Sequence, residues 1–278
     1  MLPINKEYYK KNPFTVLVSL VSGTKYVDYH SVRCDTLNTS FGNSKVGKVG
    51  CFNFPIEYTC VNCECKRKKK CYALNGCYMF HSNQATYSEN YAFWKAIGKD
   101  GFVDAMVKRI TENKWRLFRY FTCGDIPEIS FFDAMVEIAN RCPDVKFWLY
   151  TKKYGIVNIW CNKNGVENIP SNLTVIFSHW LNDDGSYFPM SNPYNFPTSE
   201  FIPIGREELK EQVTFICPCS DPNVYSTCET CEHPCFDLKH GQSMALLEHS
   251  TPKTRKRDKA IRKAKEAIKK AMKRGNKK

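Results

Sequence analysis

The segment from Trp115 to Lys152, WRLFRYFTCGDIPEISFFDAMVEIANRCPDVKFWLYTK, decides the fold. Its aromatic-rich first part, up to Thr122, predicts a strand, and Val145 to Thr151 predicts a second, buried strand. Between them, Ser130 predicts the N-cap of a helix. A strand, a helix and a strand in this order form a βαβ unit, which indicates parallel strands. The apolar positions of the helix are Phe131, Met135, Ile138 and Ala139.

The rest of the body continues this alternation of strand-like and helix-like windows. We therefore predict an α/β fold, either an open sheet or a partial (β/α) barrel, over residues 1–252, followed by a basic helical tail over residues 253–278. A single core can still grow at this chain length. The further strand windows are Phe14–Val21, Val49–Pro55, Leu173–Ser178 and Val213–Ile216, and the helix windows are Ala85–Ile97 and Phe102–Glu112.

Ten of the fifteen cysteines form two groups with short spacings. Thiolates spaced in this way converge on a soft metal ion or an iron–sulfur cluster, so the clustering predicts a metal-binding protein. The front cysteine cluster comprises Cys60, Cys63, Cys65, Cys71 and Cys77, and the back cysteine cluster comprises Cys217, Cys219, Cys228, Cys231 and Cys235.

Two other interpretations of the cysteines carry less weight. A disulfide framework requires an oxidising compartment, whereas the chain shows no basic-then-apolar leader and has an odd number of cysteines, so we expect a cytoplasmic protein. The isolated cysteines are interpreted as small buried hydrophobic residues without chemistry. They are Cys34, Cys51, Cys123, Cys142 and Cys161.

In an α/β fold, the active site lies at the carboxyl ends of the parallel strands. The segments that follow the predicted strands are polar or rich in cysteine, and we expect both cysteine clusters to share one mouth with them. Each polar group also has a structural interpretation, because Asp125 is a candidate cap for the next turn, Lys152 a solvent-facing cation and His179 a structural histidine. The polar segments are Cys123–Pro127, Thr151–Lys153 and Ser178–Trp180.

The net charge of +13 is concentrated in the tail. Residues 253–278 contain fourteen of the 41 Lys and Arg residues and two of the 28 Asp and Glu residues, which leaves the preceding 252 residues at +1. Ile261, Ala264, Ile268 and Met272 give the tail a thin apolar stripe at helical spacing. The tail therefore predicts a nucleic-acid partner or a solvated extension. The chain has no apolar stretch long enough to predict a membrane span.

Several stretches of the chain together form a recognisable pattern. They are Asn43–Lys48 before Phe54–Pro55, Cys71–Ala73, Phe121–Asp125, Pro143–Lys152 and the Cys-x2-Cys-x3-Cys of Cys228, Cys231 and Cys235. These stretches resemble the gene product 88 family of phages and mobile elements. The resemblance extends from about Asn38 to Cys235 and implies kinship, but the family has no established activity to carry over. A phage-encoded member would act in the cytoplasm of its bacterial host.

The order of parts also resembles, more distantly, that of radical S-adenosylmethionine (SAM) enzymes. Those enzymes bind a [4Fe–4S] cluster through three cysteines after the first strand of a partial (β/α) barrel. After the second strand, a Gly-Gly-Glu-Pro-type turn meets the SAM amino group. The resemblance implies that SAM lies at Gly124 and Asp125, in a similar turn that reads Gly-Asp-Ile-Pro.

The resemblance further implies that Cys60, Cys65 and Cys71 bind the [4Fe–4S] cluster, with Cys63 as the substitute. The usual Cys-x3-Cys-x2-Cys spacing is absent, so several triples remain open. The lysine run Lys66–Lys70 within this loop favours thiolate and an anionic cluster, or is simply a solvated loop.

The back cysteine cluster supplies a second set of ligands. Four thiolates close a structural zinc site or hold an auxiliary [4Fe–4S] cluster, and spacing alone does not choose between them. Cys219 is a spare ligand, and His233 is interpreted as a polar loop residue. The predicted ligands are Cys217, Cys228, Cys231 and Cys235.

Two functions of different classes follow from these observations. The first is an iron–sulfur enzyme of radical-SAM type, whose substrate the sequence does not name. The second is a non-catalytic, zinc-stabilised protein that binds nucleic acid through residues 253–278.

Overall fold

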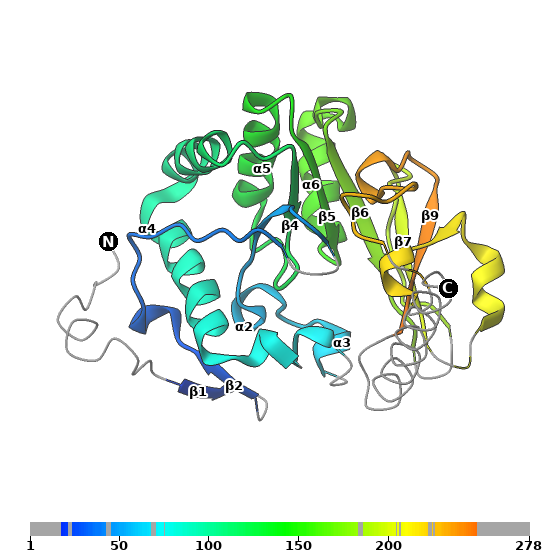
Figure 1. Ribbon diagram of the computed structural model, residues 1–278, viewed down its shortest axis with the longest axis horizontal. Coiled ribbons are helices and arrows are strands. Elements are labelled where there is room, and N and C mark those ends of the chain that lie inside the picture. The colour runs from blue at the N-terminus through cyan, green and yellow to red at the C-terminus, as the bar shows by residue number, and fades with distance from the viewer. Residues whose placement is uncertain are drawn as a thin grey trace, which may run out of the picture.

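The computed structural model describes residues 18–21, 24–42, 46–67, 71–74, 76–182, 186–203, 205, 207–221, 224 and 226–248. A sheet of seven parallel strands in the order β3-β4-β5-β6-β7-β9-β8 forms its centre (Figure 1). The predicted α/β class is therefore confirmed, and the sheet stays open, with β3 and β8 at its edges. The strands are β3 (Gly50–Phe52), β4 (Leu117–Tyr120), β5 (Lys146–Thr151), β6 (Leu173–His179), β7 (Thr198–Ile202), β8 (Phe215–Ile216) and β9 (Ser243–Leu247).

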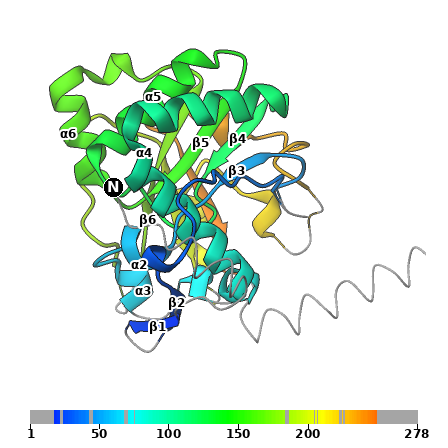
Figure 2. The ribbon, with the colours of Figure 1, turned by 90° about the vertical axis from the view of Figure 1, so that its left-hand side faces the viewer.

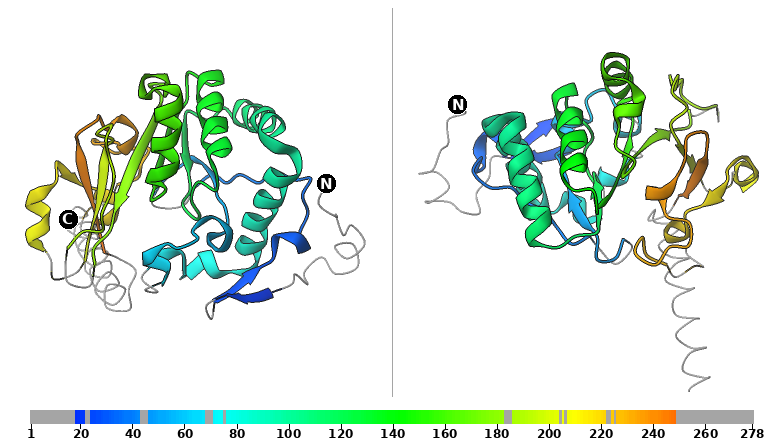
Figure 3. Two further views of the ribbon diagram at one scale, coloured as in Figure 1. Left: turned by 180° about the vertical axis from the view of Figure 1, so that it is seen from behind. Right: turned by 90° about the horizontal axis from the view of Figure 1, so that it is seen from above.

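Three helices cover one face of the sheet: α4 (His81–Glu112), α5 (Ile129–Arg141) and α6 (Tyr154–Asn164). Figures 2 and 3 show them as neighbours from two further sides, with α5 between α4 and α6. The predicted apolar positions of α5 are fully buried against the sheet. Phe131 is central, because its ring contacts those of Trp94, Phe102 and Phe121. Burial of each such ring contributes about 1.5–3 kcal/mol.

Helix α4 joins the two helix windows that the sequence predicted separately. Its dihedral angles are interrupted at Gly98, whose φ of 71° and ψ of −172° turn the chain between two helical arms. The two arms of α4 lie at a steep angle in Figure 1. Glycine adopts this positive φ without the steric cost of a Cβ atom, so the bend is encoded in one residue.

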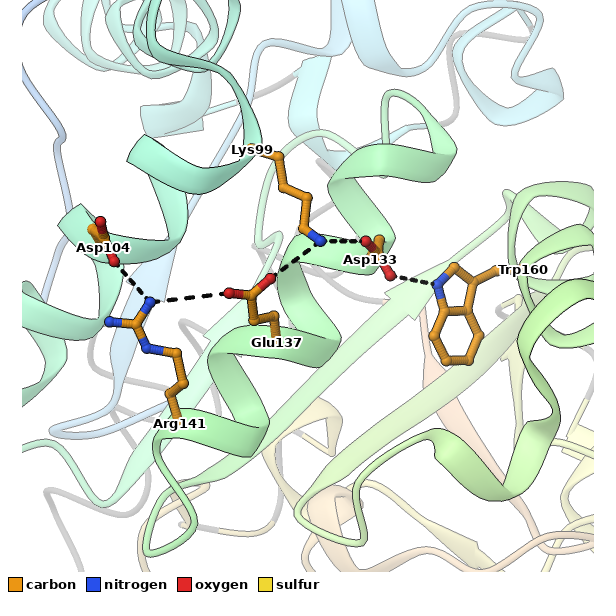
Figure 4. A network of polar contacts seen from close by, with 6 residues as sticks. All are labelled: Lys99, Asp104, Asp133, Glu137, Arg141 and Trp160. Atoms are coloured by element: carbon orange, nitrogen blue, oxygen red, sulfur yellow. Dashed lines mark hydrogen bonds and ion pairs between the residues drawn. The ribbon is translucent and has the colours of Figure 1, made fainter.

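A polar network ties the second arm of α4 to the next two helices (Figure 4). Lys99 follows the bend and pairs with Asp133 and Glu137 of α5. Asp133 also accepts a hydrogen bond from Trp160 Nε1 of α6 at 3.0 Å. These side chains are partly exposed, so each pair alone contributes little, but the network fixes how the three helices are spaced.

The opposite face of the sheet carries no helix from this layer. Alternation along β4 sends Phe118 and Tyr120 to the helices and Leu117 to the other side. There, Trp148 and Ile176 pack against the segment that carries the back cysteine cluster. We call this side the open face of the sheet.

The remaining described elements are short. A two-stranded antiparallel hairpin, β1 (Val18–Val21) and β2 (Thr24–Val27), lies beside the first arm of α4. Helices α2 (Ile56–Thr59) and α3 (Glu64–Arg67) follow β3 and lie below the carboxyl ends of the strands in Figure 1. Within the described part of the chain, no helix is long and apolar enough to cross a membrane.

Several sequence predictions need correction. Ser130 is not the N-cap of α5, because Glu128 occupies that position and Ser130 lies inside the first turn. Strands β7 and β9 were not predicted, and β8 has only two residues of the predicted Val213–Ile216 window. The tail of residues 253–278 and the beginning of the Phe14–Val21 window lie outside the described residues.

Candidate metal centres

The front cysteine loop follows β3 and folds back on itself through short backbone hydrogen bonds. The amide of Cys60 donates to the carbonyl of Ile56 at 3.0 Å, that of Cys63 to Cys60 at 3.3 Å and that of Cys71 to Cys65 at 3.0 Å. These tight turns bring together four cysteines of the loop that span twelve residues of the sequence.

The sulfur atoms of this loop are in direct contact. Cys63 Sγ lies 3.1 Å from Cys65 Sγ, and Cys65 is also hydrogen-bonded to Cys71. The contact with Cys63 lowers the pKa of Cys65, but the contact with Cys71 and burial outweigh it and raise that pKa to about 11. Burial, and next the charge of Asp125, raise the pKa of Cys60 well above its usual value. The structure thus groups all three preferred ligands with Cys63, the predicted substitute.

Two other cysteines near this loop behave differently from expectation. Cys77 is exposed and therefore stands apart from the four grouped thiols. Cys123, interpreted from sequence as inert, is only 3 % exposed and packs with Cys65 and Cys71. Burial raises its pKa, with Cys60 as the next cause. The available signal was its position directly after a strand, where the sheet places it beside the front cysteines.

Lys152 supplies a positive charge beside the front thiols. It follows β5, donates from Nζ to Ser178 Oγ at 3.2 Å and lies 5.3 Å from the centre of the Trp180 ring. Burial lowers the pKa of Lys152, but Cys65, Cys63 and Asp125 outweigh it and raise the pKa overall. The ammonium group is therefore held in its charged form where thiolates would need a counter-charge.

Asp125 is held by hydrogen bonds from three groups. Its Oδ1 accepts from the amide of Ile126 at 2.8 Å and from Thr151 Oγ1 at 2.6 Å, and its Oδ2 accepts from the amide of Lys152 at 2.9 Å. The side chain thereby fastens the end of β4 to the end of β5. The structural role expected from sequence was a cap of the next turn, whereas the observed hydrogen bonds mainly join two strand ends. SAM contact stays a prediction.

Gly124 is required by the backbone. Its φ is 88°, and a Cβ atom there would lie 2.5 Å from the carbonyl oxygen of Phe54. The turn after β4 therefore approaches the chain after β3 more closely than any other residue permits.

Glu57 is a further buried group that the sequence did not single out. It is 9 % exposed, and both carboxylate oxygens are buried without a hydrogen-bond partner. Burial raises its pKa, and Lys66 partly offsets this. Lys66 itself donates to the carbonyl of Ile56 at 3.3 Å, so this first lysine of the predicted run bends back over α2. Residues 68–70 of that run lie outside the described residues.

The back cysteine cluster surrounds a small cavity of about 10 Å³ on the open face. All five of its cysteines line the cavity, together with Trp148, Pro234 and Phe236. Cys219, the predicted spare ligand, therefore lies with the other four. Hydrogen bonds from Cys219 and Cys235 hold the pKa of Cys217 well below its usual value. His233 is exposed and its ring lies against Phe215, in agreement with a loop residue.

The two cysteine clusters do not share one mouth. The front thiols pack with Ile56, Ala73 and Cys123 at the carboxyl ends of β3 and β4, whereas the back thiols pack with Trp148 and Ile176 on the open face. The expectation of one common site was correct for the front cysteines and the polar strand ends. It was wrong for the back cysteines, because the long segment after β8 returns across the sheet.

The chemistry of the donor sets fits metal binding at both places. Each offers at least four thiols, and few other side chains compete with them. Among the described residues, no group of three or more His, Cys, Asp or Glu side chains is already arranged to hold an ion, and neighbouring thiols instead share hydrogen bonds. Metal binding would replace these S–H contacts by ligation, with release of protons.

Comparisons with known proteins give one match. The model of the gene product 88 family matches residues 30–195, which include the front cysteines, α4 and the strands β3 to β6. No curated protein and no solved structure matches the chain. Since the match covers more than half of the 278 residues, the chain belongs to the gene product 88 family.

Proposed function

We propose that this protein is an iron–sulfur enzyme of radical-SAM type. In this proposal Cys60, Cys65 and Cys71 hold a [4Fe–4S] cluster, and Cys63 is the alternative ligand. The observation that carries it is the grouping of these thiols, in which Cys65 contacts Cys63 and Cys71, beside the half-buried Lys152 at the carboxyl edge of a parallel sheet. This edge is where α/β enzymes place their chemistry.

The residues around the front thiols fit defined roles. When bound, such a cluster supplies reductive cleavage of SAM and thereby starts hydrogen abstraction. Lys152 balances the negative charge of the thiolates, since its pKa stays high despite burial. Gly124 and Asp125 shape the strand end at which SAM is proposed to bind, and the network of Asp125 keeps that turn rigid.

The back cysteine cluster is proposed as a second metal centre, with a zinc ion or an auxiliary cluster. Its cavity is lined in part by an indole ring, a phenyl ring and a proline, and two of its thiols, Cys217 and Cys235, are buried. Cys217, Cys228, Cys231 and Cys235 are the proposed ligands, and the placement of Cys219 in the same cavity makes it an equal candidate.

The test is the iron, zinc and acid-labile sulfide content of protein purified without oxygen, together with its absorption spectrum. Iron and sulfide are expected, and they should disappear from the front centre in the Cys60→Ser, Cys65→Ser, Cys71→Ser triple variant. Cys77→Ser, in the same segment but exposed, is the matched control and should keep them. Addition of SAM and a reductant should then give SAM cleavage in the Cys77→Ser control and none in the triple variant.

Zinc without sulfide, after anaerobic handling, would overturn this proposal. The zinc-stabilised, nucleic-acid-binding function would then take its place. That function predicts salt-sensitive binding of DNA or RNA that is lost when residues 253–278 are removed.

A further inference from the structure

The open face carries a cationic side chain between the two cysteine clusters. Arg119 of β4 is paired in register with Cys51 of β3 on one side and Trp148 of β5 on the other. It points away from the helices, since its neighbours Phe118 and Tyr120 are buried in the helix-side core. We propose that Arg119 binds the anionic group, a carboxylate or a phosphate, of a small polar molecule.

Within the described part of the chain, no carboxylate is among the groups that act most on Arg119. Its Nε is buried without a hydrogen-bond partner, and its guanidinium carbon lies 5.0 Å from the centre of the Tyr150 ring. The groups that act most on its charge are Tyr72, Tyr150, Cys228 and Cys51, with no carboxylate among them. Cys228 is a proposed ligand of the back centre, so the charge of its thiolate would be shared with the metal. A half-buried cation without a carboxylate beside it is costly, whereas a bound anion would lower that cost.

Tyr72, one of the groups that act on the charge of Arg119, contacts the wall of a neighbouring cavity. Its ring lies 5.4 Å from the ring of Tyr78, which lines that cavity. Tyr72 is anchored there by a hydrogen bond from its hydroxyl to the carbonyl of Thr122 at 2.8 Å.

A cavity of about 200 Å³ adjoins this region, with Cys51, Tyr78 and Thr122 in its wall. Its volume equals that of roughly seven water molecules, which suits a small molecule. The other described residues of its lining are uncharged and rich in hydrogen-bonding groups, among them Asn53, Asn83 and Thr86. The site would therefore hold the anionic end of a ligand at Arg119 and the polar, uncharged remainder in the cavity.

This inference rests on the proposed function only in treating the bound molecule as a substrate. Anion binding itself requires neither SAM nor a reductant. If the natural protein binds anions but contains no iron and sulfide, the proposed function alone is overturned. If it contains iron and sulfide but does not bind anions, this inference alone is overturned.

The test is thermal unfolding of the full chain, as purified, in potassium chloride, potassium phosphate and potassium acetate at equal pH and ionic strength. The unfolding temperature of the natural protein should rise with anion concentration, because a ligand bound by the folded state stabilises it. Arg119→Met should lose this rise and, in chloride, should unfold no earlier than the natural protein, because the unpaired charge is gone. A rise with phosphate alone would assign a phosphate ligand, and a rise with acetate would assign a carboxylate.

Arg116→Met is the matched control. Arg116 precedes the same strand, is 76 % exposed and pairs with Asp144 at 3.6 Å, so its variant should keep the full anion response. Three results would overturn the proposal: no anion response in the natural protein, an equal response in Arg119→Met, or early unfolding of Arg119→Met in chloride, which would assign Arg119 a structural role.

Discussion

The front and back cysteine clusters contain similar thiols in different surroundings. The front thiols lie at the sheet edge beside a cation, Lys152, and a carboxylate, Asp125. The back thiols lie on the open face around a cavity of about 10 Å³ with aromatic and proline walls. Charged neighbours tune the chemistry of a metal, whereas apolar walls exclude water and stabilise a fixed site. If both clusters bind metal as proposed, the difference favours a reactive centre at the front and a structural centre at the back.

The largest effect is expected from loss of a back thiol. Cys217→Ser should lower the free energy of unfolding by more than the roughly 1–3 kcal/mol of an unsatisfied buried polar group, because metal-binding free energy at a structural site is folding free energy. Cys65→Ser at the front should abolish iron and sulfide there and lower stability much less. Chemical denaturation and metal content of both variants measure this contrast.

Chelation provides the control for this pair. Removal of metal from the natural protein should lower the free energy of unfolding about as much as Cys217→Ser does. Removal of metal from Cys217→Ser should add little to the loss. If Cys65→Ser is instead the more destabilised variant, the assignment of a reactive front and a structural back is wrong.

The second effect concerns the charge at the front centre. Lys152→Met should weaken retention of the front metal by about 10-fold or more, as is typical when a group that supports metal ligands is removed. Lys153→Met, at the adjacent position, is the matched control. Metal content after dialysis against a chelator is the measurement, and equal retention in the two variants would show that Lys152 does not support the centre.

The third effect separates the two roles of Asp125. In the natural protein, three hydrogen bonds reach the two carboxylate oxygens of Asp125. Asp125→Asn keeps one acceptor oxygen, so we expect a loss of about 1–3 kcal/mol in the free energy of unfolding. Asp144→Asn, 84 % exposed at the surface, should change little. If Asp125 also meets SAM, its variant should bind SAM more weakly in equilibrium dialysis. Stability loss with unchanged SAM binding would leave the structural role alone.

The sequence predicted the centre of the sheet better than its second half. Strands β4 to β6 and helix α5 carry strong apolar periodicity, and buried positions such as Phe131 followed it. Strands β7 and β9 have weak local patterns and pair in register through Thr198 and Ser243, so tertiary neighbours decide them. Both helix windows were correct, and Gly98, whose dihedral angles are not helical, separates them as the two arms of α4.

The candidate sites show the same limit. Short spacing identified the front and back cysteines, because turns of a few residues can bring only close neighbours together. Cys123 and Arg119 are isolated in the sequence, and only the pairing of strands places them beside the two clusters. Spacing also gave no sign that the segment after β8 returns over the open face.

The smallest effect tests whether the carboxyl edge responds to pH. His179 Nδ1 lies 3.0 Å from Glu200 Oε2, and its other ring nitrogen lies 2.9 Å from the carbonyl oxygen of Phe188. Burial lowers the pKa of His179, but Glu200 and then Phe188 raise it overall. A histidine pKa that is raised on folding contributes stability fully below the unfolded pKa of about 6.5, and this stability disappears as pH rises through the folded pKa.

The stability difference between the natural protein and His179→Gln should therefore be largest near about pH 6 and shrink toward about pH 8. Chemical denaturation at several pH values across that range measures it. His240→Gln is the control, because His240 contacts the carbonyl oxygen of Tyr194 and no carboxylate of the described chain. A difference that grows with pH would mean that His179 is held neutral, and the carboxyl edge would then lack the ion pair that distinguishes it from the open face.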